Sequence, residues 1–371
     1  MRTDIKVAVV GGSLTGPLVE LLLRAIGFTD VTTYEAGPES RAQSGGVIGI
    51  RETGFEALRW AGVPLSDVVA YPGKDVITYN IDNRRVLGLR DHTQYPGETT
   101  AWDIYNDALR ARVNIHYGRK VTGINPDGGL SFADGSTVDC DLVIFADGRN
   151  STGRKLLDPN RRLHYQGYVV WRGITTPVDG VRGFTRYRND AHGNLFSITE
   201  PMVQGVNTGL TDWTYYQNLS EERFTDLVGA SPTRRVFLLP HHFDARPQLR
   251  EHVNGYAERY LPDEFVSTVE QTRELLAVPI NDLSIPSRAV WRVGNVRALL
   301  VGDSLVNVRP HAGRGANNGI DQAWELIRML CRHTDLDDAL LAWQASVIPQ
   351  VMQWIELGKA RARRNGLGVP T

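Results

Sequence analysis

The sequence is poor in cysteine, in net charge and in long apolar runs. Its two cysteines among 371 residues, Cys140 and Cys331, are far apart in the sequence and indicate buried free thiols of a reducing cytoplasm. The 41 basic and 42 acidic residues leave a net charge of −1, which does not favour nucleic acid or an acidic membrane surface as a partner. No apolar run approaches the length of a membrane span, and the first residues lack the features of a signal peptide. We therefore expect a cytoplasmic protein without nucleic-acid or membrane partners.

The chain opens with a strand, a glycine-bearing turn and a helix. Ile5–Val10 is a largely β-branched apolar run that predicts a buried parallel strand. The turn that follows holds Gly11 and Gly16, with the small Ser13 between them, and it leads into an apolar helix over Leu18–Ile26. This order is typical of a turn that carries a phosphate at a helix N-terminus.

A carboxylate completes this pattern. A second predicted strand, Val31–Tyr34, ends on Glu35, where a carboxylate can accept hydrogen bonds from ribose hydroxyls. Strand, glycine-rich turn, helix, strand and acid together form the dinucleotide-binding fingerprint. The sequence therefore predicts an adenine dinucleotide site, and the identity of the dinucleotide stays open at this point.

Two later strands also end beside an acid and a glycine. Cys140–Ala146 predicts a buried strand that stops at Asp147-Gly148, and Val296–Val301 predicts another that stops at Gly302-Asp303. Further glycines precede a helix predicted over Ile320–Leu330. Glycines at a helix start let the backbone approach a ligand and aim N–H groups at a negatively polarised atom.

The middle of the chain has a different character. Leu163–Ala277 alternates aromatic and polar residues between turn-forming residues, which predicts an antiparallel sheet with one buried face. Helices are predicted at Glu221–Val228 and Leu249–Arg259, and a strand is predicted at His116–Ile124. The chain after Asp335 is predicted to be helical.

Three motifs in one order carry a resemblance to a known family. They are Gly11-x-Ser13-x-x-Gly16 with Glu35, Asp147-Gly148-x-x-Ser151, and Gly302-Asp303 with Pro310-x-x-Gly313-x-Gly315-x-Asn317-x-Gly319. This set resembles the single-component FAD-dependent aromatic hydroxylases, which share the para-hydroxybenzoate hydroxylase fold. Two segments, Tyr168–Gly173 and Arg309–Gly313, look most like the branch that contains 2,6-dihydroxypyridine hydroxylase.

The resemblance implies an α/β fold in which a Rossmann-like FAD-binding domain is interleaved with a substrate domain built on an antiparallel sheet. The FAD-binding domain would comprise residues 1–75, 98–160 and 278–334. The substrate domain would comprise residues 76–97 and 161–277, and its sheet would cover the flavin ring. Residues 335–371 would form C-terminal helices.

The family's cofactor contacts can be carried over residue by residue. The positions implied for FAD are Gly11, Ser13, Leu14, Thr15, Gly16, Glu35, Ala36, Asp147, Gly148, Gly302, Asp303, Pro310, Gly313, Gly315, Ala316 and Asn317, and no metal is expected. Asp303 would accept hydrogen bonds from the ribityl hydroxyls, and backbone N–H groups near Gly315 would stabilise the reduced ring through the helix dipole. No second glycine-rich fingerprint follows, so NADPH or NADH should dock on the surface and leave.

Three residues depart from the family pattern. Phe145 stands where glycine usually precedes Ala-Asp-Gly, and Gln322 stands in Asp321-Gln322-Ala323 where Glu-Asp-Ala is usual. Trp102 stands where an arginine is usual. We expect the first two to alter cofactor packing and the third to weaken contacts to phosphate.

Hydroxylation of an electron-rich ring requires a base or a hydrogen-bond acceptor at the substrate hydroxyl. The candidates are His311, Tyr215, His192, Tyr168 and Asp212, with Arg172 as an anion anchor. His311 ranks first because its loop would lie beside the isoalloxazine, and Tyr215 and Arg172 complete the predicted catalytic set. Asp212 and Tyr215 are three residues apart on one predicted strand, so at most one of them faces the pocket.

The sequence thus predicts a monomeric or homodimeric FAD-dependent monooxygenase. It would consume NAD(P)H and O2 and act through a flavin hydroperoxide on a small electron-rich aromatic or N-heterocyclic substrate. One alternative is Baeyer–Villiger-type oxygen insertion on a heterocyclic natural-product intermediate. The others are an NAD-dependent dehydrogenase, which would leave the Gly302–Gly319 stretch unexplained, and a non-catalytic FAD-binding subunit.

Overall fold

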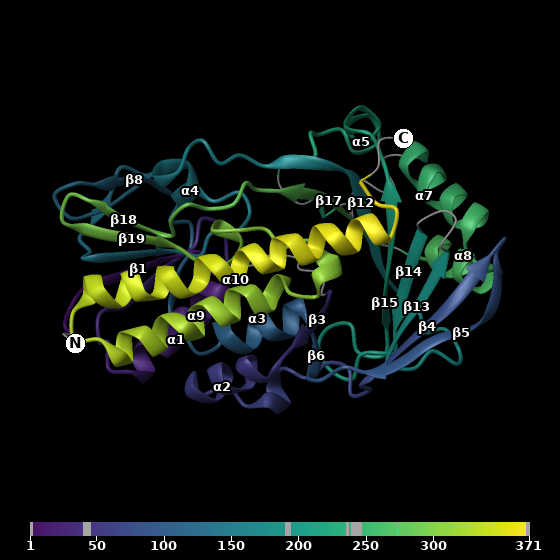
Figure 1. Ribbon diagram of the computed structural model, residues 1–371, viewed down its shortest axis with the longest axis horizontal. Helices are drawn as coiled ribbons and strands as arrows, with labels where there is room; N and C mark the ends of the chain where they lie inside the picture. The colour runs from purple at the N-terminus through teal and green to yellow at the C-terminus, as the bar shows by residue number, and fades with distance from the viewer. Residues whose placement is uncertain are drawn as a thin grey trace.

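The structure is a computed structural model that describes residues 3–39, 46–189, 194–234, 237–238, 247–272 and 274–368. Figure 1 shows an elongated molecule with a parallel sheet towards one end and a larger, mostly antiparallel sheet towards the other. The long helix α10 (Leu336–Arg364) runs from the first region to the second. This arrangement confirms the predicted α/β fold class with C-terminal helices.

The parallel sheet holds the first predicted strand at its centre. In the described residues its order is β18 (Val290–Val293), β19 (Val296–Leu300), β11 (Leu142–Phe145), β1 (Val7–Val10), β2 (Val31–Tyr34) and β7 (Ile115–His116). All pairs are parallel except β18–β19. Every residue of β1 and β11 is buried, because both faces of the sheet are covered.

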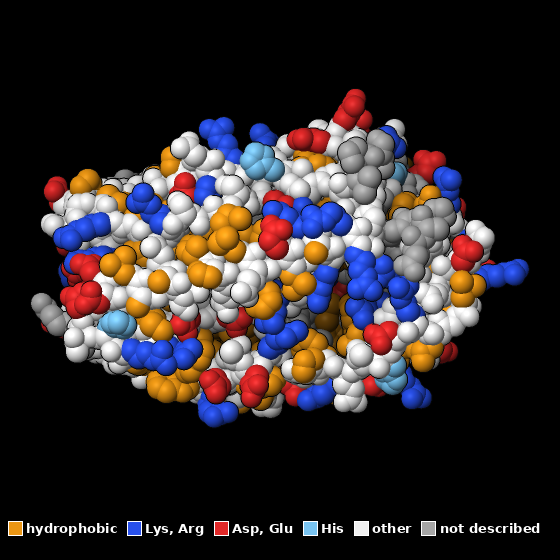
Figure 2. Space-filling view, viewed as in Figure 1, with side chains coloured by type: hydrophobic (Ala, Val, Ile, Leu, Met, Phe, Trp, Pro, Cys, Tyr) orange, Lys and Arg blue, Asp and Glu red, His pale blue; other side chains and the backbone are white. Residues whose placement is uncertain are grey.

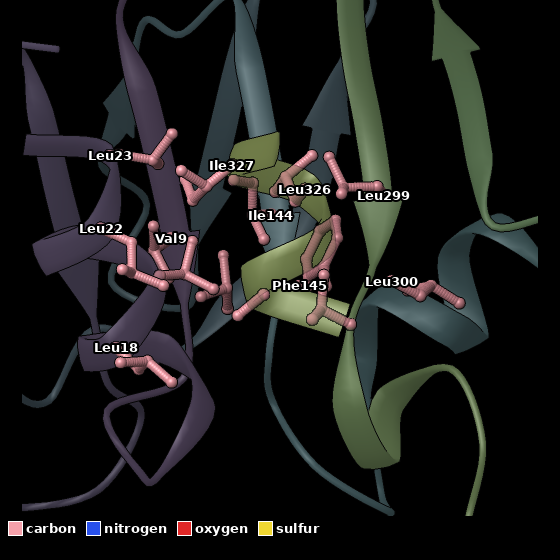
Figure 3. Close-up of a cluster of buried hydrophobic side chains, with 14 of the residues drawn as sticks. Val9, Leu18, Leu22, Leu23, Ile144, Phe145, Leu299, Leu300, Leu326 and Ile327 are labelled. Carbon is pink, nitrogen blue, oxygen red and sulfur yellow. The ribbon is translucent and has the colours of Figure 1, made fainter. Parts of the chain in front are cut away.

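Helices cover this sheet and close its core. They are α1 (Thr15–Ala25), α2 (Glu52–Trp60), α3 (Trp102–Arg110), α4 (Thr152–Leu157) and α9 (Gly315–Arg332). Figure 3 shows the core between them, with Leu18 and Leu22 of α1, one helical turn apart, beside Val9 of β1. Leu326 and Ile327 of α9 reach the same cluster. Apolar residues at this spacing put one stripe of each helix into the core.

The second sheet has eight strands in the described residues. Its order is β16 (Phe237–Leu238), β17 (Glu274–Asp282), β12 (His164–Thr175), β15 (Thr211–Asn218), β14 (Asn194–Thr199), β13 (Phe184–Asn189), β4 (Asp75–Asp82) and β5 (Arg85–Gln94). The pairs are antiparallel except β13–β4, which is parallel. One face packs on α5 (Glu221–Val228), α7 (Pro247–Tyr260) and α8 (Asp263–Glu270), and this contact forms a second core.

The described residues form further short elements besides the two large sheets. A three-stranded sheet joins β8 (Val121–Asn125), β9 (Gly129–Phe132) and β10 (Thr137–Val138), and β3 (Val47–Ile50) pairs with β6 (Glu98–Ala101). Single turns of 3-10 helix are η1 (Leu65–Asp67), η2 (Gly302–Ser304) and η3 (Pro310–Ala312). The single strand predicted over His116–Ile124 is wrong, because the chain turns at Gly118 with φ +70° and continues as β8.

Both cysteines are free, as predicted, but only Cys140 is buried. Cys331 lies on an exposed position near the end of α9, so the prediction of its burial is wrong. Within the described ranges, no helix combines the length and the apolar character that a membrane crossing requires.

Arg309, just before η3, joins the flanking loop to the eight-stranded sheet. Its Nε and Nη2 donate to the two carboxylate oxygens of Asp282 at 2.9 and 2.6 Å, and Nη2 also donates to Gln166 Oε1 at 2.7 Å. The two charged side chains are only 9% and 16% exposed. A pair as buried as this one fixes the loop in register with β12 and β17.

We therefore expect Asp282→Asn to destabilise the protein, because it leaves a nearly buried guanidinium without its counter-charge. The free energy of unfolding in urea should fall by about 3 kcal/mol. The matched control is Glu356→Gln, which removes an acid from the exposed pair with Lys359 and should change little. Equal stability of the two variants would contradict the role given to Asp282.

Candidate active site

The turn between β1 and α1 is shaped by its glycines. Gly11 has φ +115°, and a Cβ added there would lie 2.4 Å from the carbonyl oxygen of Ala146. A Cβ at Gly16 would lie 1.8 Å from the carbonyl oxygen of Gly11, so neither position accepts a side chain. In the described residues no side chain caps α1 at Leu14. The first N–H groups of α1 are therefore available to a phosphate.

Glu35 lies beside this turn at the end of β2. Its Oε2 accepts from the Gly12 N–H at 2.8 Å and its Oε1 accepts from the Gly37 N–H at 2.7 Å. A pocket opens next to it, lined by Gly12, Ser13, Glu35, Pro38, Trp102, Asn106, Arg110 and Tyr117. This pocket has the position expected for the adenosine half of a dinucleotide, at the carboxyl ends of the parallel strands. Ala36 follows Glu35 and is exposed.

A cation remains near this pocket although Trp102 replaces the usual arginine. Arg110 lies two turns further along α3, and its Nε and Nη2 donate to the Tyr117 hydroxyl at 2.9 and 2.6 Å. Arg110 and Trp102 both line the pocket. A guanidinium of the same helix therefore lies at the pocket where the usual arginine is missing, while the expected weakening of the phosphate contacts stays a prediction.

Asp147 follows β11 and anchors the next helix. Its carboxylate accepts from the Ser151 hydroxyl and from the N–H groups of Thr152 and Gly153, the latter two at 2.6 and 3.1 Å. Burial raises the pKa of Asp147, and these hydrogen bonds oppose the rise. Asp147 thus caps α4, while Gly148, at φ +74°, borders open space.

Asp303 lies in η2, at the end of β19. Its side chain borders open space. The surrounding protein nevertheless desolvates the carboxyl group and raises its pKa to about 6, although the charges of Arg149 and Arg154 act to lower it. Gly302, at φ +67°, donates its N–H to Gln322 Oε1 at 2.7 Å. The amide oxygen of Gln322 therefore serves here as an acceptor in a motif position where the family usually has a carboxylate.

The start of α9 also borders open space. Gly313, at φ +62°, and Gly315 have no atom within 4 Å of the place that a Cβ would occupy. In the described residues no side chain caps α9 at Arg314, so the N–H groups of Gly315 and Ala316 start the helix uncapped. Asn317 has a structural role, since its Oδ1 accepts from the Arg51 N–H at 3.1 Å and its Nδ2 donates to the Gly49 carbonyl at 2.6 Å.

These features fit FAD. The uncapped start of α1 suits its pyrophosphate, Glu35 suits its adenosine ribose, and Asp303 suits the ribityl chain. The open space at Gly313 and Gly315 and the uncapped start of α9 suit the carbonyl edge of the isoalloxazine. Thr15 lies against Gly302 and Gly319, at 3.0 and 2.4 Å from the places that their Cβ atoms would occupy, and so holds α1 and α9 close together.

His311 of η3 contacts two tyrosines of the eight-stranded sheet. Its Nε2 is 3.0 Å from the Tyr168 hydroxyl, and its ring centroid is 4.5 Å from that of Tyr216. Burial, followed by the charges of Arg309 and Arg361, lowers the pKa of His311 to about 3. The imidazole is therefore neutral at physiological pH. Its Nδ1 is buried without a partner among the described residues.

Arg172 is not free to anchor an anion by itself. Its Nη2 donates to Asp212 Oδ2 at 2.6 Å, and Asp212 also accepts from the Val47 N–H at 2.9 Å. Gly46 lies over the guanidinium, where a Cβ would come within 1.7 Å of its central carbon. The carboxylate of Asp212 therefore neutralises the predicted anion anchor.

The structure does not bring Tyr215 to His311, so this part of the predicted catalytic set is wrong. Tyr215 points into the second core, where its hydroxyl donates to the Val253 carbonyl at 3.0 Å. Side chains alternate along β15, so Asp212 and Tyr216 share the opposite face. Tyr216 was not among the predicted candidates. It lies four residues after Asp212, and side chains two or four residues apart on a strand share a face, so the position of Asp212 indicates it. His192, another candidate, lies outside the described residues.

A parallel sheet with two uncapped helix starts and an acid at its carboxyl edge defines a dinucleotide-binding protein. The chain belongs to the family described as FAD binding domain, whose model matches residues 4–342. This match confirms the predicted family, FAD as the cofactor and the class of FAD-dependent monooxygenases.

Known relatives match over nearly the whole chain. The 2,6-dihydroxypyridine 3-monooxygenase of Paenarthrobacter nicotinovorans is 26% identical, and the match covers 98% of this chain and 92% of the relative. The kynurenine 3-monooxygenase of Salinispora arenicola is also 26% identical, with 97% and 80% covered. The solved structure of 2,6-dihydroxypyridine-3-hydroxylase from Arthrobacter nicotinovorans has a TM-score of 0.84 at 23% identity, with 100% of this chain and 95% of that chain covered, which shows a shared fold.

We expect Asp303→Ala to lose FAD, because the carboxylate that faces the ribityl position is removed. Purified variant protein should hold less than about a tenth of the FAD of the wild type, as one to two charge-assisted hydrogen bonds are lost. The flavin absorbance at equal protein concentration measures this. Asp226→Ala, an exposed change on α5, is the control and should keep its flavin. Stoichiometric FAD in Asp303→Ala would refute this assignment.

The low pKa of His311 predicts a specific loss of stability in acid. The unfolded chain takes up the histidine proton as the pH falls through about 6.5, whereas folded His311 stays neutral down to about pH 3. The wild type therefore loses stability below pH 6.5, by about 1.4 kcal/mol for each pH unit from this residue. The difference in unfolding free energy between pH 7.5 and pH 5.5 should be smaller in His311→Asn, and an unchanged difference would contradict a buried neutral His311.

Proposed function

We propose that the protein is an FAD-dependent, NAD(P)H-consuming monooxygenase that hydroxylates a small electron-rich aromatic or N-heterocyclic substrate. One observation carries this proposal. The neutral His311, held by Tyr168, lies on the loop that leads within four residues to the uncapped start of α9. The residue that would face a ring hydroxyl and the helix that would face the flavin are therefore parts of one short segment.

Bound FAD would supply the redox chemistry: reduction by NAD(P)H and activation of O2, of which one atom enters the substrate ring and the other becomes water. The chain supplies the surroundings for this chemistry. The N–H groups at the start of α9 would stabilise negative charge on the reduced ring through hydrogen bonds and the helix dipole. Asp303 and the start of α1 would hold the two ends of the cofactor. The eight-stranded sheet would exclude water from the reacting atoms.

His311 would orient the substrate rather than remove its proton. A residue whose pKa is lowered to about 3 is too weak a base to accept a phenolic proton at neutral pH. The pKa of Tyr168 is raised by burial, so its hydroxyl keeps the proton and can donate to His311 Nε2. The neutral ring then carries its own proton on Nδ1, which can donate a hydrogen bond to an oxygen of the substrate.

The test begins with the visible spectrum of the purified protein. We expect bound or reconstitutable FAD, together with oxidation of NADPH or NADH and uptake of O2 that a panel of hydroxypyridines, phenols and aromatic acids stimulates. Absence of flavin after reconstitution would favour a dehydrogenase. Flavin without stimulated oxidation would favour a binding subunit, and a lactone product would favour Baeyer–Villiger chemistry.

A pair of tyrosine variants tests the site within this assay. Tyr168→Phe should lower kcat about tenfold with the best substrate, because His311 loses one hydrogen-bond partner. Tyr215→Phe makes the same chemical change on the neighbouring strand, on the face away from His311, and should keep kcat. Equal effects of the two changes would remove the support for His311.

A further inference from the structure

The end of α10 lies against the part of the eight-stranded sheet that contacts His311. Ala362 of this helix and the following Leu367 are buried in one apolar cluster with Tyr168 and Tyr216. These two tyrosines are the ones that contact the His311 ring. Figure 2 shows a hollow bordered by Lys and Arg side chains in the region where Figure 1 places this end of the helix. The last helix is therefore a neighbour of the candidate active site.

The residues that follow α10 are fixed to the sheet. The helix ends in a turn at Gly366, with φ +63°, in which the Leu367 N–H donates to the Ala362 carbonyl at 3.0 Å. The Asn218 side chain, at the end of β15, donates to the Gly366 carbonyl at 2.8 Å and accepts from the Gly368 N–H at 3.0 Å. The end of α10 therefore has a defined position relative to β15.

Arg361 contacts the loop that carries His311, residues 309–313, which we call the η3 loop. The Nη1 of Arg361 donates to the carbonyl oxygens of His311 and Ala312 at 2.7 and 3.3 Å. The hydrogen bonds of the 3-10 turn itself use the carbonyls of the two preceding residues. Arg361 therefore supplies a donor to the two carbonyl groups that the turn leaves over.

The η3 loop is held from two sides. Before the turn, Arg309 pairs with Asp282 of β17, and α10 passes close to it, since a Cβ added at Gly358 would lie 3.1 Å from the Cβ of Arg309. Arg361 holds the turn from the other side. Burial is the main cause of the low pKa of His311, and the charges of Arg309 and Arg361 add to it. The guanidinium of Arg361 thus contacts the backbone of the histidine and disfavours protonation of its ring.

We propose that Arg361 is a positioning residue for the proposed reaction, because it keeps His311 in contact with Tyr168 and Tyr216 and its ring turned towards the substrate. This inference rests on the proposed function. Both contacts of Arg361 are with the backbone of the η3 loop, so the arginine acts through His311 and not on the substrate itself. Arg361 also lies beyond residue 342, where the family match ends, so the motifs of the family do not indicate it.

The first test compares kcat and KM with the best substrate. Arg361→Gln should lower kcat about tenfold and change KM less than about threefold, because charge-assisted contacts to the loop are lost while other groups still bind the substrate. Arg361→Lys keeps the charge without the planar fork and should lower kcat about threefold. Arg363→Gln changes an exposed arginine two residues further along α10 and should keep kcat. FAD content is measured for each variant, so that loss of the cofactor is recognised.

The second test asks whether Arg361 acts through His311. In a His311→Asn background, Arg361→Gln should lower kcat by less than about a further twofold, because the group that Arg361 positions is already absent. An arginine that only supports the fold would lower kcat by the same factor in both backgrounds. The two single variants and the double variant form a complete cycle with the wild type.

The third test needs no substrate. Hydrogen exchange followed by mass spectrometry, on peptides that cover the η3 loop of the FAD-loaded protein, reports how often this loop opens. The N–H groups of Ala312 and Gly313, which close the 3-10 turn, should exchange about tenfold faster in Arg361→Gln than in the wild type. The N–H groups in the middle of α9 should exchange at the same rate in both proteins.

Three results would overturn the inference: unchanged kcat in Arg361→Gln, equal losses in the two backgrounds, or unchanged exchange of the η3 loop. If Arg361→Gln does not fold, the same measurements on Arg361→Lys decide, with the smaller effect expected for it. Failure of the proposed function is distinct, because it appears in the wild type as missing NAD(P)H oxidation. The exchange measurement still shows in that case whether Arg361 holds the loop.

Discussion

The register of the parallel sheet is the constraint on which the site depends. Val10, Phe145 and Leu300 occupy one row of adjacent strands, and the N–H groups that follow extend the pairing, Ala146 to Val10 at 2.8 Å and Val301 to Phe145 at 2.9 Å. The turns that begin at residues 11, 147 and 302 therefore leave the sheet at one edge. Motifs separated by more than a hundred residues meet there because of backbone hydrogen bonds, before any side chain acts.

This dependence explains how much of the fold was predictable. Strands, turns and helix starts are properties of short segments, so the fingerprint with Glu35 and the strand before Asp303 were recognisable from local patterns. The pairing of β15 with β12 decides instead which face of β15 lies towards His311. A shift of one residue in this pairing would put Tyr215 in the place of Tyr216. The partner of Arg172 is likewise supplied by another strand. Local patterns alone therefore gave the cofactor half more reliably than the substrate half.

Two residues that depart from the family pattern are also accommodated by contacts between different elements. Phe145 packs against Gly153, where a Cβ would come within 2.1 Å of the ring, so the larger residue is accommodated by a glycine on α4. Gln322 accepts the Gly302 N–H, and its own amide donates to Asn318 at 2.9 Å. In both cases a neighbour on another element restores the packing or the hydrogen bond, and only the fold reveals it.

The surroundings of His311 depend on a segment beyond the family match, which ends at residue 342. Arg361, near the end of α10, donates to the carbonyl oxygens of His311 and Ala312 at 2.7 and 3.3 Å. The same guanidinium helps to keep His311 neutral. A single side chain thus fixes the position of the histidine backbone and disfavours the protonated imidazole. Because these effects come from the last helix, a change there can alter the surroundings of His311 without touching the motifs of the parallel sheet.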